Sequence, residues 1–150
     1  MIAALNRFIF RSTDRCRPFF QLLHKWEGFE WTKEYALAFQ QLKEYLSRPP
    51  IMSWPKEVEI LFAYVVVASY VVSLVLTQVD NGVQRPVYYV SKSLHEAEVY
   101  YLPLEKAILA IVHATRKLPH YFQSHTIIVL TQLLLQSLLR SADYVGRVAK

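Results

Sequence analysis

Apolar side chains recur at helical spacing in two stretches of the chain. Residues 31–46 have the pattern of an amphipathic helix with one apolar face, and Thr32 is at the position of its N-cap. The apolar positions of that face are Tyr35, Phe39, Leu42 and Leu46. The second stretch begins at Pro103, which fits the first turn of a helix, and stops at Pro119. Its repeating positions are Leu104, Ile108, Ile111 and Thr115. Both stretches therefore predict helices, and residues 133–139 are a candidate for the start of another.

Between and after these helices the pattern is that of β-strands. Three strands are predicted at residues 58–67, 71–79 and 84–91, and the pair Asn81-Gly82 is the strongest turn signal in the chain. A fourth strand is predicted at residues 125–132, after the second helix. The simplest arrangement is a three-stranded antiparallel meander whose fourth strand lies parallel to the first. The pattern thus predicts an α/β (α+β) fold with one mixed sheet, preceded by helices.

An uncharged run at residues 60–76 admits a second interpretation, as a membrane span. The run is shorter than the about 20 residues that a spanning helix needs. It is rich in Val, Tyr and Phe, and Ser69 and Ser73 interrupt it. These features favour two buried strands joined by a turn, although no Gly, Asn or Asp lies at that turn. A small membrane-associated protein remains the alternative.

Composition narrows the class of protein. Of the 150 residues, 53% are hydrophobic and 19% are charged, so the chain can bury a core and is not a disordered protein. The one cysteine, Cys16, cannot form an internal disulfide or a zinc cage by itself. This favours a reducing intracellular compartment, cytoplasmic or nuclear. The five histidines show no metal-ligand spacing, so they predict no metal site.

Positive charge is concentrated near the amino terminus. The net charge is +5, and residues 1–25 hold five basic side chains against the single acid Asp14. The basic residues are Arg7, Arg11, Arg15, Arg17 and Lys25. They are candidates for contacts to nucleic-acid phosphates, while a solvated basic helix face explains them equally well. A cleaved mitochondrial presequence is a further interpretation, which Asp14 and the aromatic residues Phe19 and Phe20 disfavour.

Several phrases, in order along the chain, resemble one family. They are AALNRFI (3–9), DRCRPFFQLL (14–23), FEWTKEYALAFQQLKEYLSRPPI (29–51), QRPVYYVSKSLHEAEVYYLPLEKAILAIVHATRKLPHYF (84–122) and IIVLTQ (127–132). This string resembles the RNase H-like domain that follows the polymerase in the Pol polyprotein of gypsy-type LTR retrotransposons, especially plant ones. The resemblance implies a helical leader and connector at residues 1–50, derived from the polymerase thumb. It implies a partial RNase H-like domain at residues 51–150, truncated at its carboxyl terminus.

Active members of this family cleave RNA in RNA:DNA hybrids with two divalent ions, Mg²⁺ in particular, held by Asp and Glu side chains. The resemblance places three of those carboxylates where this sequence has Val66, Ala107 and Gln132. A fourth acid would fall beyond Lys150. Glu105 does not replace the acid at position 107, because two residues along a helix turn the side chain by about 200°. The resemblance therefore implies no catalytic residue, no metal ligand and no cofactor in this chain.

The implied function is that of a degenerate domain, a non-catalytic connection or tether in a reverse transcriptase. Its expected partners are the backbone of an RNA:DNA hybrid or primer–template and the polymerase domain of the same polyprotein. An active ribonuclease H within an RNA-directed DNA polymerase polyprotein is the alternative, and it predicts cleavage of a hybrid with magnesium or manganese.

Overall fold

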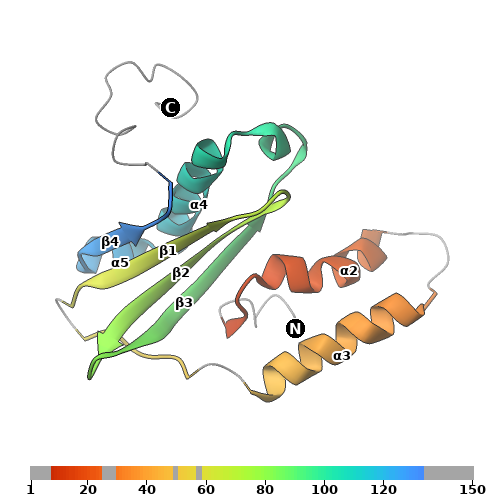
Figure 1. Ribbon diagram of the computed structural model, residues 1–150, viewed down its shortest axis with the longest axis horizontal. Helices are drawn as coiled ribbons and strands as arrows, with labels where there is room; N and C mark the ends of the chain where they lie inside the picture. Colours follow the sequence, from red (N-terminus) through yellow and green to blue (C-terminus); the bar gives the residue numbers. More distant parts are fainter. Residues whose placement is uncertain (1–7, 25–29, 49–50, 57–58, 134–150) are drawn as a thin grey trace.

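A four-stranded mixed sheet with helices forms the molecule in the computed structural model, which describes residues 8–24, 30–48, 51–56 and 59–133 (Figure 1). Its elements are α2 (Ser12–His24), α3 (Lys33–Ser47), β1 (Leu61–Val67), β2 (Val71–Asp80), β3 (Val83–Ser93), the 3-10 helix η2 (Glu96–Tyr100), α4 (Pro103–Lys117), α5 (Pro119–Ser124) and β4 (Ile127–Leu130). The helix predicted to begin at residues 133–139 lies outside the described residues, apart from Leu133.

The sheet has the order β3-β2-β1-β4. β1 pairs antiparallel with β2, and β2 pairs antiparallel with β3. β4 returns after α4 and α5 and pairs parallel with β1, with Leu61 opposite Ile127 and Tyr64 opposite Leu130. The predicted mixed sheet, with an antiparallel meander and a fourth strand parallel to the first, is confirmed.

The two hairpins are built differently. Between β2 and β3, Asn81 and Gly82 have φ angles of 50° and 78°, the left-handed conformation that a two-residue hairpin turn requires. Between β1 and β2, the Ala68 N–H donates to the Val71 carbonyl at 2.9 Å. In this turn between β1 and β2, no residue has a positive φ, in agreement with its lack of glycine. The turn signal at Asn81-Gly82 is confirmed, and the first hairpin forms without one.

The uncharged run at residues 60–76 forms β1, the first hairpin and the first part of β2. In the described part of the chain, no helix is long and apolar enough to cross a membrane. The interpretation of this run as a membrane span is therefore not supported. Its apolar side chains are explained by strands that pack under a helix.

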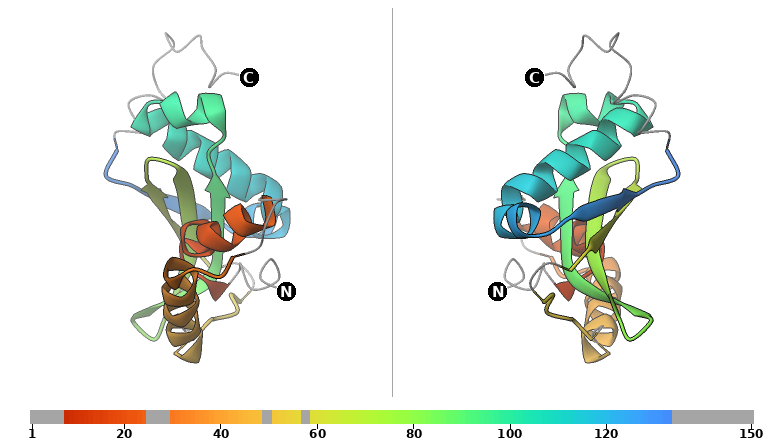
Figure 2. Two further views of the ribbon diagram at one scale, coloured as in Figure 1. Left: turned by 90° about the vertical axis from the view of Figure 1, so that its right-hand side faces the viewer. Right: turned by 90° about the vertical axis from the view of Figure 1, so that its left-hand side faces the viewer.

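α4 covers one face of the sheet and forms the main core with it. Figure 2 shows α4 running obliquely across the strands. The buried residues of this core are Leu61, Ala63, Leu74, Leu76, Val87, Val90, Ala114 and Leu118. Because neighbouring side chains of a strand point to opposite faces, Leu74 points to α4 and Val75 to the other face. The β-branched and aliphatic runs thus fold as strands. Along the first part of β1 buried and partly exposed positions alternate, whereas β2, which lies between β1 and β3, buries nearly all of its first eight residues.

Element boundaries differ from the predictions where tertiary contacts decide them. β1 begins at Leu61 rather than residue 58, and β4 ends at Leu130, so Gln132 lies in a bend after the strand. Pro119 ends one helix and also begins α5, which the sequence analysis did not predict. Thr32 occupies the N-cap position of α3, but its side chain makes no capping hydrogen bond. The predicted helix at residues 31–46 is otherwise confirmed as α3.

α3 packs its predicted apolar face against α2 only in part. Leu42 is buried with Ile9 and Cys16, and Phe19 packs against the same cluster. Phe39 is 44% exposed and contacts Phe19 edge-on, with ring centroids 6.4 Å apart. Within the described residues, α2 is thus part of the folded structure and packs through Cys16 and Phe19.

α2 lies beside β3 and is joined to it by hydroxyl groups. The Ser91 hydroxyl is 2.7 Å from the hydroxyls of both Ser12 and Thr13, and it accepts the Thr13 N–H at 3.1 Å. Ser12 is 1% exposed. Ser91 and Val90 point to opposite faces, and Val90 packs under α4, so α2 contacts side chains of the face opposite α4.

Replacing Ser91 by Ala should loosen this junction. The change removes the acceptor of the Thr13 N–H and the partner of the buried Ser12 hydroxyl, so we expect a loss of about 1–3 kcal/mol in the free energy of unfolding. Urea unfolding followed by circular dichroism measures it. Ser93→Ala, two residues along the same strand, is the matched control and should change stability by less than about 0.5 kcal/mol. Equal effects of both changes would contradict the junction.

Candidate functional site

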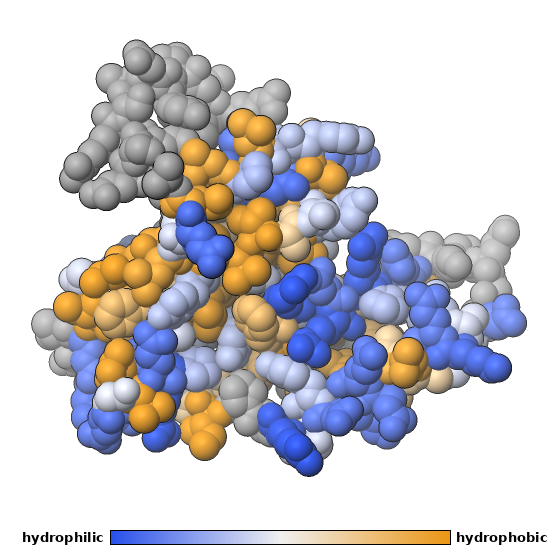
Figure 3. Space-filling model, in the orientation of Figure 1, coloured by the Kyte–Doolittle hydropathy of each residue, from blue (hydrophilic) through white to orange (hydrophobic). Residues whose placement is uncertain are grey.

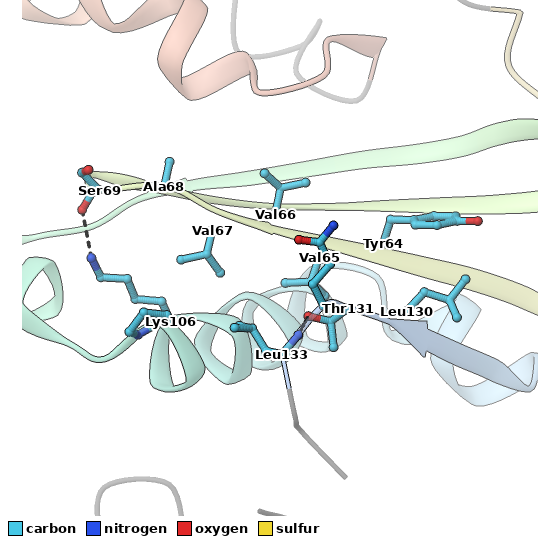
Figure 4. A pocket seen from close by; sticks show the side chains of 12 residues that line it. Tyr64, Val65, Val66, Val67, Ala68, Ser69, Lys106, Leu130, Thr131 and Leu133 are labelled. Atoms are coloured by element: carbon cyan, nitrogen blue, oxygen red, sulfur yellow. Dashed lines mark hydrogen bonds between the residues drawn. The ribbon is translucent and has the colours of Figure 1, made fainter. Parts of the chain in front are cut away.

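An open groove of about 960 Å³ lies at the end of β1. It forms because β1 is longer than β4. The pairing of these strands ends at Tyr64 and Leu130. In the described part of the chain, residues 65–67 of β1 therefore extend past the end of β4 and do not pair with it. The start of α4 closes the groove from one side (Figure 4). Its lining consists of Tyr64, Val65, Val66, Val67, Ala68, Ser69, Pro103, Lys106, Leu130, Thr131, Gln132 and Leu133.

Two of the three positions assigned to family carboxylates meet in this groove. Val66 and Gln132 both line it, the first from β1 and the second from the bend after β4. Figure 4 shows Val65 and Val67 pointing toward α4, and Val66 pointing to the other side of β1. Ala107 does not line the groove, since its side chain is fully buried on α4. Ala107 thus lies outside the groove, on the buried face of α4.

Lys106 is a groove residue that the sequence analysis missed. Only 8% of it is exposed, and its ammonium donates to the Ser69 carbonyl of the first hairpin at 3.1 Å (Figure 4). The preceding residue, Glu105, is turned to the start of α4, where its carboxylate accepts the Leu102 N–H at 2.9 Å. A signal was present in the sequence, since Lys106 adjoins the position assigned to the family glutamate.

The side chains of the groove do not suit divalent metal ions. Hard cations such as Mg²⁺ take oxygen ligands, above all carboxylates. Among the described residues, the lining contains no Asp or Glu, and the Lys106 ammonium adds a positive charge that repels a cation. Elsewhere in the described residues, no group of three or more His, Cys, Asp or Glu side chains is placed to hold a metal. We therefore derive no metal-dependent step from this groove.

The basic residues predicted to bind nucleic acid make intramolecular contacts where they are described. Arg11 forms an ion pair with Asp14. Arg15 lies over the Tyr45 ring, 4.4 Å from its centroid, and Arg17 lies over the Tyr70 ring at 5.0 Å. These three arginines thus fix α2 internally and against α3 and the first hairpin. The other two candidates, Arg7 and Lys25, lie outside the described residues.

Groups suited to nucleophilic or acid–base chemistry are not gathered in the groove. Cys16 is fully buried beside α3, and burial raises the pKa of its thiol, an effect that the nearby Arg15 charge opposes. On α4, burial and the charge of Lys117 lower the pKa of His113. Neither residue lines the groove. The described lining of the groove therefore offers hydroxyl, amide and ammonium groups.

Comparison with known proteins identifies related sequences. Residues 31–129 match a family described as the RNase H-like domain found in reverse transcriptase. The retrovirus-related Pol polyproteins from transposons 297 and 412 of Drosophila melanogaster are 35% identical over 118 residues and 32% identical over 106 residues. These matches cover 77% and 71% of this chain. The transposon Tf2-3 polyprotein of Schizosaccharomyces pombe is 26% identical over 121 residues, or 80% of the chain. The chain spans about a tenth of the length of these curated relatives.

Solved structures with a similar fold are those of a foamy viral protease-reverse transcriptase. Its dRH form in complex with double-stranded DNA has a TM-score of 0.79 at 18% identity, and the match covers 93% of this chain and 25% of that chain. The complex with an RNA/DNA hybrid has a TM-score of 0.70 at 17% identity, and the match covers 94% and 19%. At these identities the similarity shows the fold. With the family match over most of the chain and the identity to the transposon 297 protein, the chain belongs to the family of RNase H-like domains found in reverse transcriptase, of the kind carried by retrotransposon Pol polyproteins.

Proposed function

We propose that this domain is a non-catalytic connection or tether in the reverse transcriptase of a retrotransposon Pol polyprotein. In this proposal residues 1–50 are the thumb-derived leader and connector, and residues 51–150 are the RNase H-like part. In the same proposal the retrotransposon is of the gypsy type and of the plant lineage, which the sequence phrases favour. The fully buried Cys16 fits an intracellular reducing compartment.

The observation that carries the proposal is the chemistry of the groove at the end of β1. Val66 and Gln132 line it where the family resemblance places carboxylates, and Lys106 adds a cation. Ala107 is enclosed between α4 and the sheet. A two-metal mechanism needs several carboxylates converging on the same ions. A domain that keeps the RNase H-like fold but has this groove is suited to support the polymerase and to contact the nucleic-acid backbone, rather than to hydrolyse RNA.

The proposed partners are the polymerase domain of the same polyprotein and the backbone of a nucleic-acid duplex. The curated relatives are whole Pol polyproteins, of which this chain matches about a tenth, so the other domains are encoded beside it in those proteins. The foamy viral enzymes of the same fold were solved in complex with double-stranded DNA and with an RNA/DNA hybrid. Both facts support, for this chain, a position beside a polymerase and close to the duplex.

A cleavage assay tests the absence of catalysis. The full chain is incubated with an RNA:DNA hybrid labelled on the RNA strand, in magnesium and separately in manganese. We expect the RNA to stay as intact as in the protein-free sample, because the described lining of the groove has no carboxylate to bind either ion. An active ribonuclease H on the same substrate is the positive control. Cleavage that disappears with EDTA would overturn the proposal and favour the alternative, an active ribonuclease H.

A further inference from the structure

We propose that the groove at the end of β1 binds a phosphodiester group of a nucleic-acid backbone, with the Lys106 ammonium as its cation. The inference rests on the proposed function, which it makes more specific by assigning a contact site. It differs from the sequence-based expectation, which placed the phosphate contacts on the arginines of the amino-terminal segment.

The first support is the unused hydrogen-bonding capacity of Lys106. An ammonium group has three donor hydrogens, and the Ser69 carbonyl accepts one of them at 3.1 Å. Within the described residues the ion pairs are Arg11–Asp14, Asp80–Arg85 and Lys92–Glu98, so Lys106 has no carboxylate partner there. A largely buried cation without a counter-ion is stabilised by an anion that enters its site.

The second support is the sign of the charge around the groove. Among the described residues of the lining, Lys106 is the one that carries a charge. Pro103 brings the first turn of α4 to the same groove, and the amino-terminal end of a helix carries a partial positive charge. Glu105, the acid of that turn, is engaged with the Leu102 N–H and is not part of the lining. The electrostatic field in the groove therefore favours an anion.

The third support is the shape and the neutral lining. The groove is open and has a volume of about 960 Å³, enough for a phosphate with its flanking sugars. Ser69, Thr131 and Gln132 provide polar groups along it, and Tyr64 and Leu130 provide apolar walls. In Figure 3 the hydrophobic side chains gather over β1 and the neighbouring part of the molecule, whereas hydrophilic ones predominate over α2 and α3. This combination suits a phosphodiester backbone, in which charged phosphates alternate with apolar sugar carbons.

Four other basic side chains are already engaged in intramolecular contacts. Arg11 and Lys92 are in ion pairs, and Arg15 and Arg17 lie over tyrosine rings. A phosphate bound by any of these four side chains competes with an existing intramolecular contact. Lys106 needs to give up no carboxylate or ring within the described structure.

Fluorescence anisotropy with a labelled RNA:DNA hybrid and the full chain tests the inference. Gln132→Glu adds a negative charge in the groove at an exposed position, so folding should be retained. Gln41→Glu adds the same charge at an exposed position of α3 and is the matched control. We expect about tenfold weaker binding for Gln132→Glu and less than about twofold for Gln41→Glu. Lys106→Met should weaken binding by about tenfold and lower the salt-dependence slope by about one; a thermal melt shows whether this variant is folded.

Each outcome decides between the two proposals. Binding by the wild type that Gln132→Glu leaves unchanged would overturn the groove as the phosphate site, while the contact to nucleic acid in the proposed function would stand. Equal weakening by Gln132→Glu and Gln41→Glu would also overturn the site, because it would show a general charge effect. If the wild type does not bind the hybrid, the groove and the nucleic-acid contact of the proposed function both fail.

Discussion

Ala107→Glu, which restores the family's acidic residue on α4, is expected to unfold the protein at urea concentrations that leave the wild type folded. Ala107, Ala110 and Ala114 are 0%, 3% and 0% exposed and lie along one side of α4. These small side chains let α4 pack closely on the sheet, so a glutamate at position 107 has neither room nor water. We expect a loss of about 3 kcal/mol or more, from overpacking and from burial of a charge.

Ala107→Gln separates the two causes. Glutamine has nearly the same volume as glutamate but no charge, so this variant should lose only the part that comes from overpacking, about 1–3 kcal/mol. The difference should depend on pH. Burial raises the pKa of the introduced carboxyl above its unfolded value, so the folded state binds the proton more tightly and the glutamate variant regains stability as the pH falls toward 4. Urea unfolding at pH 7 and pH 4.5 measures this. A glutamate variant as stable as the wild type would show that position 107 is open to the groove.

The consequence for the groove is that acidic side chains placed at all three positions would not converge in it. Val66 and Gln132 are accessible from the groove, so carboxylates at these two positions would meet solvent. Ala107 is covered, and Lys106 beside it places an ammonium in the groove. This arrangement is the physical basis of the proposed support role, because the helix packs where the family resemblance expects a metal ligand.

Local signals in the sequence predicted the fold well. Runs rich in Val, Tyr and Phe located β1, β2 and β3 to within three residues at each end, and Asn81-Gly82 located the second hairpin. The first hairpin has no such local signal. Its Ser69 carbonyl is bonded by Lys106, which lies 37 residues away in the sequence. A turn held by a long-range contact cannot be recognised from its own residues.

Long-range contacts also limited the prediction of the site. Arg15 and Arg17 have the spacing of a free basic helix face, yet Tyr45 and Tyr70, from α3 and the first hairpin, lie under them. Ala107 could be assigned by resemblance to a family position, but its burial depends on how α4 crosses the sheet. The family resemblance therefore only assigned residues to the carboxylate positions, and the structure was needed to see which of these residues share a groove.

Leu74→Ala is expected to lower the free energy of unfolding by about 3 kcal/mol, since truncating a buried leucine removes apolar contacts and leaves a cavity. Leu74 is 1% exposed, on a strand with a neighbour on each side and under α4. Val75→Ala is the matched control on the next residue, which is partly exposed and points to the other face. It should lose about 1 kcal/mol or less.

The ratio of these two losses, measured by urea unfolding, reports on the face of the sheet opposite α4. That face carries a row of partly exposed side chains, Tyr64, Val75 and Tyr89, paired across three strands. A loss for Val75→Ala as large as that for Leu74→Ala would contradict the partial exposure of Val75 in this row. It would mean that this face is covered in solution, and the dependence of the loss on protein concentration would then distinguish a second copy from a segment of the same chain.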